Sequence, residues 1–301
     1  MTTTLLRTYQ GYNAINQFAA NFYRTSHGLQ ISAQRRFSRG FSAGLNWNWT
    51  PYDVGNYSGD YSVTQRLEHR ADGTVGLRAD QPQWEALMAD QGTPHHIFKG
   101  NAVWNIPGPS GGSRIVHELL NDWQVSGVWT AQTGGGYSIG YSYQNNGNSV
   151  NLTGSPDYGS RVRIIGNPGS GCSDNQYQQF NTAAFAGPTY GSNGMESGRN
   201  YMHGCFTSIW DLAVARFVRL GGTRNIQLRV EVYNFFNTAT VTGRNTGMTL
   251  NNPIDQVLQN NQFNADGTLN QSRVKPQSSG FGAANGWTNP LSVQAQIRFG
   301  F

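Results

Sequence analysis

Residues 291–301 alternate apolar and polar side chains without a break. The apolar members are Leu291, Val293, Ala295, Ile297, Phe299 and Phe301. Successive side chains of a strand point to opposite faces, so this pattern predicts a strand with one apolar face. The eleven residues also match the roughly 9–11 with which a tilted strand crosses a bilayer. The last strand of a soluble sandwich alternates in the same way, so this segment alone leaves both interpretations open.

Six further segments alternate with period two: 28–38, 41–49, 98–106, 119–130, 207–220 and 225–236. Short turns at 38–40 and 221–224 join four of them into two hairpins. The chain therefore contains seven firm strands, and up to ten if the shorter patterns count, which include 137–143 and 161–165.

The connections between these strands differ in length in a regular way. Those at 38–40, 107–117 and 221–224 are short or middling, whereas 51–94, 132–206 and 237–290 are long. Consecutive antiparallel strands place alternate connections at opposite ends, so all long loops fall on one rim. Outer-membrane barrels have this asymmetry, and long irregular loops are uncommon in compact soluble domains. The predicted fold is all-β, an antiparallel transmembrane β-barrel with long extracellular loops.

The composition agrees with this fold class. Charged residues make up 12% of the chain, about half the share of a typical soluble domain. The net charge of +5 is spread along the chain, with Arg35, Arg36 and Arg39 as the tight group, so we expect no nucleic-acid partner. The first residues lack the pattern of a secretory signal, and we expect a protein working outside the cytoplasm to have lost its own beginning here.

Cys172 and Cys205 both lie in loop-like sequence. Their placement is compatible with one disulfide in an oxidising compartment, and two unrelated free thiols are the alternative.

Catalytic and metal-binding patterns are thin. The sequence contains no HExxH, GxSxG, GxxxxGK[ST] or CxxC motif. His95 and His96 are adjacent, and adjacent strand residues point to opposite faces, so they cannot chelate one ion together. We expect no enzyme activity, no cofactor and no metal site. Arg229 and Glu231 share the polar face of their strand and can form an ion pair there.

Several stretches together resemble the C-terminal half of TonB-dependent outer-membrane receptors, of the acidobacterial type with a carboxypeptidase-regulatory-like N-terminal domain. They lie at residues 9–15, 27–40, 94–107, 121–134, 180–185, 225–237 and 293–301, and span nearly the whole chain. The resemblance implies a 22-stranded barrel around a plug domain that is coupled to the TonB system. No plug is recognisable here, so residues 1–301 are expected to be a partial barrel domain, the C-terminal strands of the whole.

This resemblance implies energy-coupled uptake of a large solute, such as a siderophore or an oligosaccharide, across the bacterial outer membrane. A passive porin, a structural or adhesin-like barrel and a soluble carbohydrate-binding β domain are the alternatives. Expected partners are outer-membrane lipid, the TonB system through the absent plug, the solute, and the barrel-assembly machinery, which would read Phe299 and Phe301 as an assembly signal. The aromatic loop residues expected to contact the solute are Trp84, Tyr141, Tyr143, Tyr158, Tyr190 and Trp287.

Overall fold

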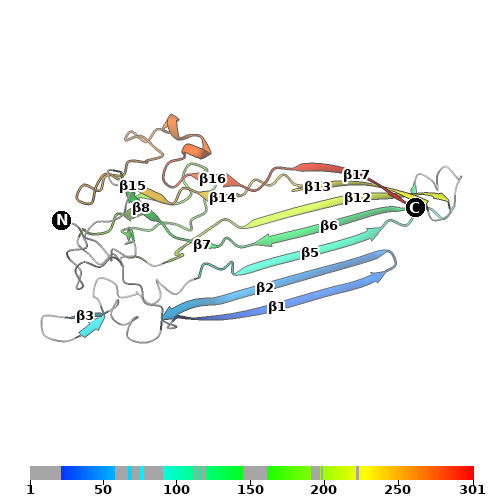
Figure 1. Cartoon of the computed structure of the whole chain (residues 1–301), viewed down its shortest axis with the longest axis horizontal. Helices are drawn as coiled ribbons and strands as arrows, with labels where there is room; N and C mark the ends of the chain where they lie inside the picture. Colours follow the sequence, from blue (N-terminus) through cyan, green and yellow to red (C-terminus); the bar gives the residue numbers. More distant parts are fainter. Residues whose placement is uncertain are drawn as a thin grey trace.

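Seven strands form one antiparallel sheet in the order β1-β2-β5-β6-β12-β13-β17 (Figure 1). The computed structural model describes residues 22–57, 67–69, 75–77, 91–111, 113, 116, 120–144, 161–190, 197, 199–221 and 224–301. The strands of this sheet are β1 (Phe22–Ser38), β2 (Phe41–Tyr57), β5 (His96–Asn105), β6 (Trp123–Gln132), β12 (Thr207–Gly221), β13 (Arg224–Tyr233) and β17 (Ser292–Gly300). The predicted seven-strand antiparallel arrangement is confirmed.

The tight turns and the C-terminus lie at one end of the sheet, and the long connections lie at the other (Figure 1). The β1–β2 turn needs left-handed backbone at Arg39, with φ of 52°, and at Gly40, with φ of 78°. Both positive φ values suit a two-residue hairpin turn. A Cβ on Gly40 would also lie 2.9 Å from the carbonyl oxygen of Asn105, so glycine is required at this position.

Strand register keeps apolar side chains on one face of the sheet and polar side chains on the other. One row of register partners runs through Phe41, Trp104, Val125, Val214, Val230 and Ala295. We call the face that carries this row the apolar face. Its exposed members include Leu29, Ile31, Leu45, Trp49, Trp210, Leu228, Val293, Ile297 and Phe299.

The first hairpin is longer than the sequence predicted. Period-two order was expected to end before Pro51, yet β1 begins at Phe22 and pairs with β2 as far as Tyr57. The register shifts between the His27–Tyr52 and Leu29–Trp49 pairs, so that two residues of β2, Thr50 and Pro51, lie opposite the single residue Gly28 of β1. A bulge of this kind shifts the alternation by one residue and accommodates a proline. The strand beyond it therefore lacked the expected pattern and was not predicted.

Two other predicted boundaries were wrong. The strand expected from residue 119 begins at Trp123, directly after Asp122 with a φ of 60°. The strand expected to reach Phe236 ends at Tyr233, because Asn234 adopts a φ of 48° and starts a turn. Left-handed residues of this kind interrupt a strand without changing its hydrophobic pattern.

The second and third long connections fold against each other. Short strands were expected within 137–143 and 161–165 and are present there, whereas the rest of these connections was expected to be irregular. Their strands form small two-stranded sheets that pair β7 (Gly136–Tyr137) with β11 (Met202–His203), β8 (Gly140–Tyr143) with β15 (Gly247–Leu250), β9 (Arg163–Ile164) with β10 (Phe185–Ala186), and β14 (Val241–Arg244) with β16 (Ala284–Trp287). We call this unit, described residues 133–206 and 234–291, the loop assembly. The first long connection is not included in this unit and contains a hairpin of its own, formed by β3 (Leu67–His69) and β4 (Val75–Leu77).

The main cluster of buried apolar residues lies in the loop assembly. It consists of Ile139, Tyr143, Val162, Phe180, Ala184, Phe185, Met202, Met248, Leu250 and Phe281. The pairing of β8 with β15 is parallel and brings together segments about a hundred residues apart. Among the described residues, no helix has the length and apolar character needed to span a membrane.

Candidate functional site

Aromatic side chains form two rows across the apolar face. Near the loop end, Trp47, Phe98, Trp129 and Trp210 stack in sequence across four strands, with ring centroids 5.5 to 5.9 Å apart. Near the turn end lie Phe41, Trp104, Trp123 and Phe299. The segment from Phe41 to Trp49 is nine residues long, which matches the roughly 9–11 tilted residues that cross a bilayer. Aromatic girdles flank the lipid-facing band of membrane barrels in this way.

The opposite, polar face carries an ion pair in β13. Arg229 Nε donates to Glu231 Oε1 at 2.8 Å, and Tyr233 Oη donates to Glu231 Oε2 at 2.7 Å. These alternate residues share one face, beside Gln294 and Gln296 of β17. The predicted pairing of Arg229 with Glu231 is present, and it gives this wall a charged, hydrogen-bonding surface.

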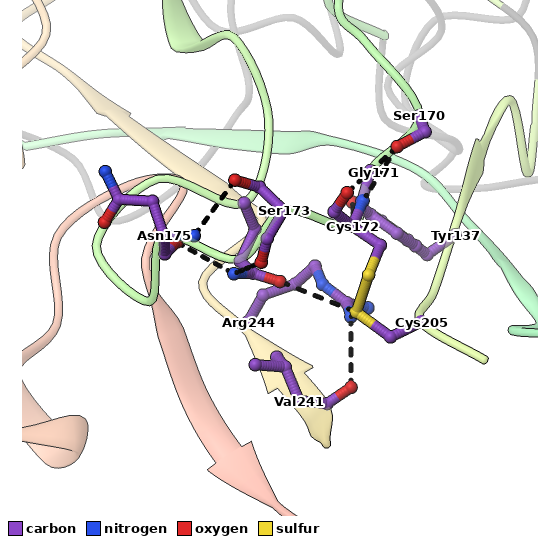
Figure 2. Close-up of a disulfide and its surroundings, with 10 residues drawn as sticks. Tyr137, Ser170, Gly171, Cys172, Ser173, Asn175, Cys205, Val241 and Arg244 are labelled. Atoms are coloured by element: carbon purple, nitrogen blue, oxygen red, sulfur yellow. Dashed lines mark hydrogen bonds between the residues drawn. A yellow bond between two sulfur atoms is a disulfide. The ribbon is translucent and has the colours of Figure 1, made fainter. Parts of the chain in front are cut away.

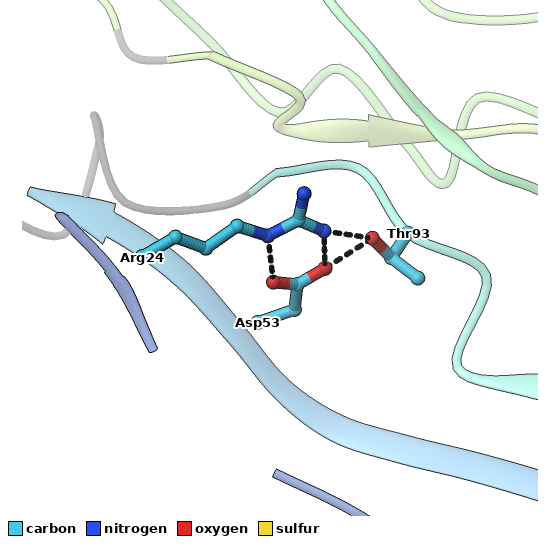
Figure 3. A network of polar contacts seen from close by, with 3 residues as sticks. All are labelled: Arg24, Asp53 and Thr93. Carbon is cyan, nitrogen blue, oxygen red and sulfur yellow. Dashed lines mark hydrogen bonds and ion pairs between the residues drawn. The ribbon is translucent and has the colours of Figure 1, made fainter. Parts of the chain in front are cut away.

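A second polar cluster fastens the first hairpin to the segment before β5 (Figure 3). Asp53 is buried, and its carboxylate accepts from Arg24 Nε at 2.6 Å, from a second Arg24 nitrogen and from the Thr93 hydroxyl. Asp53 lies four residues beyond Trp49, on the loop side of the stacked aromatic row and outside the membrane-spanning segment. The hydrogen bond from Arg24 holds the pKa of Asp53 below its ordinary value.

Buried amide side chains form hydrogen bonds with the backbone of the loop assembly. Asn234 Nδ2 donates to the carbonyls of Thr238 at 3.1 Å and Asn289 at 2.8 Å. Gln262 accepts from the Gly280 N–H at 2.6 Å and donates to the Arg273 carbonyl at 3.1 Å. Loop backbone that is buried needs such partners, so part of the Asn and Gln content serves the fold.

A disulfide joins Cys172 to Cys205 and fastens two distant parts of the second long loop (Figure 2). Beside it, the Tyr137 hydroxyl donates to the Gly171 carbonyl at 2.8 Å. The guanidinium of Arg244, from the third long loop, lies 4.7 Å from the Tyr137 ring centroid. Burial raises the pKa of Tyr137 to about 12. The disulfide therefore lies where the two loops meet.

A cleft of about 750 Å³ lies against this disulfide. It is lined by residues 172–177, Cys205, Phe206, residues 239–241 and Trp287. Tyr177, Phe206 and Trp287 supply aromatic groups, and Asn175 and Gln176 supply amides. Aromatic rings beside a few hydrogen-bonding groups are typical of a small-molecule site.

The residues predicted to contact a solute have different positions. Trp287 lines the cleft, and Tyr190 is 51% exposed. Tyr141 packs against the loop core, with its ring 5.4 Å from that of Tyr143. Tyr143 is 2% exposed and belongs to that core, so the prediction of ligand contact is corrected for this residue. Trp84 and Tyr158 lie outside the described residues.

The sequence interpretation missed Asn175, Gln176, Tyr177 and Phe206. They lie within five residues after Cys172 or Cys205. The predicted disulfide was therefore the signal that could have placed them together.

The remaining predicted residues lie elsewhere. Phe299 is 60% exposed on the apolar face, and Phe301 is 95% exposed beyond β17. His96 accepts at Nδ1 from Trp47 Nε1 at 3.2 Å, while the His95 ring lies 5.9 Å from that of His203. Among the described residues, no group of three His, Cys, Asp or Glu side chains could hold a metal ion.

Comparison with protein families gave one match, to a family model described as an outer membrane beta barrel domain, over residues 1–291. Comparisons with curated proteins and with solved structures gave no match.

Proposed function

Because this chain belongs to the family of outer-membrane β-barrel domains and resides in the bacterial outer membrane, we propose that it forms part of a TonB-dependent importer. In this proposal the apolar face contacts lipid, the polar face lines the lumen, and the loop assembly lies outside the cell. The imported solute is of the size of a siderophore or an oligosaccharide. TonB acts through a plug domain, and the barrel-assembly machinery reads Phe299 and Phe301.

The observation that carries the proposal is the loop assembly. Two connections distant in the sequence share a core of ten buried residues, and the disulfide within them cross-links the wall of the cleft beside Trp287. A rigid cleft loses little conformational entropy on binding, which favours capture of a scarce solute.

Strand direction supports a barrel larger than the seven described strands. Six antiparallel pairings separate β1 from β17, so these two edge strands run in the same direction. Closing this sheet on itself would require a parallel seam, whereas bacterial outer-membrane barrels are antiparallel with an even strand number. Further strands between β17 and β1 satisfy this requirement, and the 22-stranded barrel of the importers provides them.

A passive porin, or a structural barrel, is the second candidate. The ion pair of Arg229 with Glu231 and the neighbouring glutamines favour it, because a charged polar wall also suits a water-filled channel.

Conductance measurements on the full-length protein in planar bilayers distinguish the two candidates. An importer, whose plug fills the lumen, gives no steady open conductance, whereas a porin gives a large ohmic one. In cells, an uncoupler should abolish accumulation of the imported solute, tested with a ferric siderophore, cobalamin and a maltodextrin. Steady conductance together with uncoupler-insensitive uptake contradicts the proposal.

Trp287→Ala should weaken binding of the solute about fivefold, since an aromatic stacking contact is worth roughly 1 kcal/mol. Trp287→Phe, which keeps an aromatic ring, should retain most of the affinity. Trp104→Phe, on the apolar face, is the matched control and should bind normally. Equal affinity of Trp287→Ala and the unmodified protein would exclude the cleft as the contact site.

A further inference from the structure

The tip of the β1–β2 hairpin carries charge on the face that contacts lipid. Arg35 has Ala43 as its register partner and shares the apolar face with Ile31 and Ala33. A charged side chain on the lipid face of a barrel costs about 2–4 kcal/mol at the bilayer centre and about 0–1 kcal/mol near the interface. Its guanidinium must therefore reach an interface.

The guanidinium does reach the turn end of the sheet. The Cα of Arg35 lies level with Ala43, two residues further into the membrane than Phe41, yet its guanidinium carbon lies 5.1 Å from the Phe41 ring centroid. The long aliphatic stem carries the charge toward the rim, as expected for snorkelling. Stacking on a ring engages the face of the guanidinium and leaves the N–H groups at its edge available to an acceptor.

The described part of the chain supplies little to neutralise this charge. The first acidic residue of the chain is Asp53, so residues 1–52 carry several arginines and no carboxylate side chain. Among the described residues, no acidic side chain pairs with Arg35 or with Arg39, which is exposed on the turn itself. The aromatic ring beside Arg35 is that of Phe41, on the apolar face at the turn end. Clustered cations at an interface complement an anionic lipid head group.

We propose that this hairpin tip binds the phosphate of an anionic phospholipid in the periplasmic leaflet. Arg35 donates its edge N–H groups to the phosphate oxygens, and Arg39 adds a second positive charge at head-group level. Short turns of outer-membrane barrels face the periplasm, which places this site in the phospholipid leaflet. The site depends on membrane placement and is independent of the proposed import.

The test compares lipid binding by the purified full chain in neutral detergent, using native mass spectrometry. The probes are phosphatidylglycerol and phosphatidylcholine with the same acyl chains. Arg35→Gln should weaken phosphatidylglycerol binding about tenfold, and Arg35→Lys, which keeps the charge but not the planar fork, should weaken it less. Arg298→Gln is the matched control, because it removes the same charge from the polar face near the turn end, where Arg298 is the register partner of Gln227. This variant should bind within about twofold of the unmodified chain.

Three results would overturn the proposal. In the first, Arg35→Gln binds as the unmodified chain does, or Arg298→Gln weakens binding equally, which indicates a non-specific charge effect. In the second, inorganic phosphate displaces the lipid, which identifies free phosphate as the ligand. In the third, lipid A competes through Arg35, which assigns the site to the other leaflet. If Arg35→Gln does not fold, Arg39→Gln decides: an unchanged phosphatidylglycerol preference contradicts the proposal.

Discussion

Removing the disulfide should loosen the loop assembly and leave the sheet intact. The bond joins residues 33 apart in the sequence, so the double variant Cys172→Ser/Cys205→Ser releases a loop of that length in the opened state. The chain-entropy relation for such a loop gives about 3.7 kcal/mol. At about 1.4 kcal/mol per factor of ten, the population of the opened loop assembly should rise roughly 500-fold.

Native-state hydrogen exchange measures this opening residue by residue. The reporters are the amides of Gly140 and Gln144, which donate to Thr246 at 3.0 Å and to Leu250 at 2.8 Å across the β8–β15 contact. Amides in the β12–β13 pairing, such as those of Val214 and Val230, are the internal control in the same sample. The reporters should exchange several-hundred-fold faster, and the control amides should not change.

Two results would refute this reasoning. An acceleration of less than about tenfold at the reporters would mean that the loop core holds its structure without the cross-link. An equal acceleration of the control amides would mean that loops and sheet open as one cooperative unit.

Three further predictions concern other parts of the chain. Phe281→Ala should destabilise the loop assembly by about 3–5 kcal/mol, because Phe281 is 1% exposed and its ring centroid lies 5.2 Å from that of Phe180. Hydrogen exchange at the Gly140 and Gln144 amides measures this loss of stability. Because the pKa of Asp53 is lowered, the stabilisation from its contacts with Arg24 and Thr93 should be complete above the ordinary carboxyl pKa of 3.8 and should be lost as the pH falls through the lowered pKa. Hydrogen exchange at the Gln91 amide, which donates to the Asp53 carbonyl, should accelerate over that pH range. The Asp53→Asn variant should show no such pH dependence. Phe301→Ala should reduce the heat-modifiable, folded fraction in outer membranes if the terminal aromatic is an assembly signal, and an unchanged fraction would exclude that role.

The sheet was largely predictable because its signal is local. Alternation in residues 41–49 or 225–232 indicates which side chains lie on the apolar face and which on the polar face. Strand register then keeps the same assignment on the neighbouring strands. The prediction failed where the backbone left that pattern, at the bulge around Pro51 and at the positive φ of Asn234.

The candidate cleft was only partly predictable. Trp287 was identified as an aromatic loop residue, but nothing in the neighbourhood of Tyr143 distinguishes a buried ring from an exposed one. That difference comes from β15, about a hundred residues away, which pairs with β8 and helps to bury Tyr143.

The sequence by itself determined the strands of the wall, because a period-two pattern needs no information from elsewhere in the chain, and the order of short and long connections favoured a membrane barrel. Only the tertiary structure decided what the long loops do. Their core, their buried amides and their cleft arise from contacts between distant segments, and such contacts leave no periodic trace in the residues that make them.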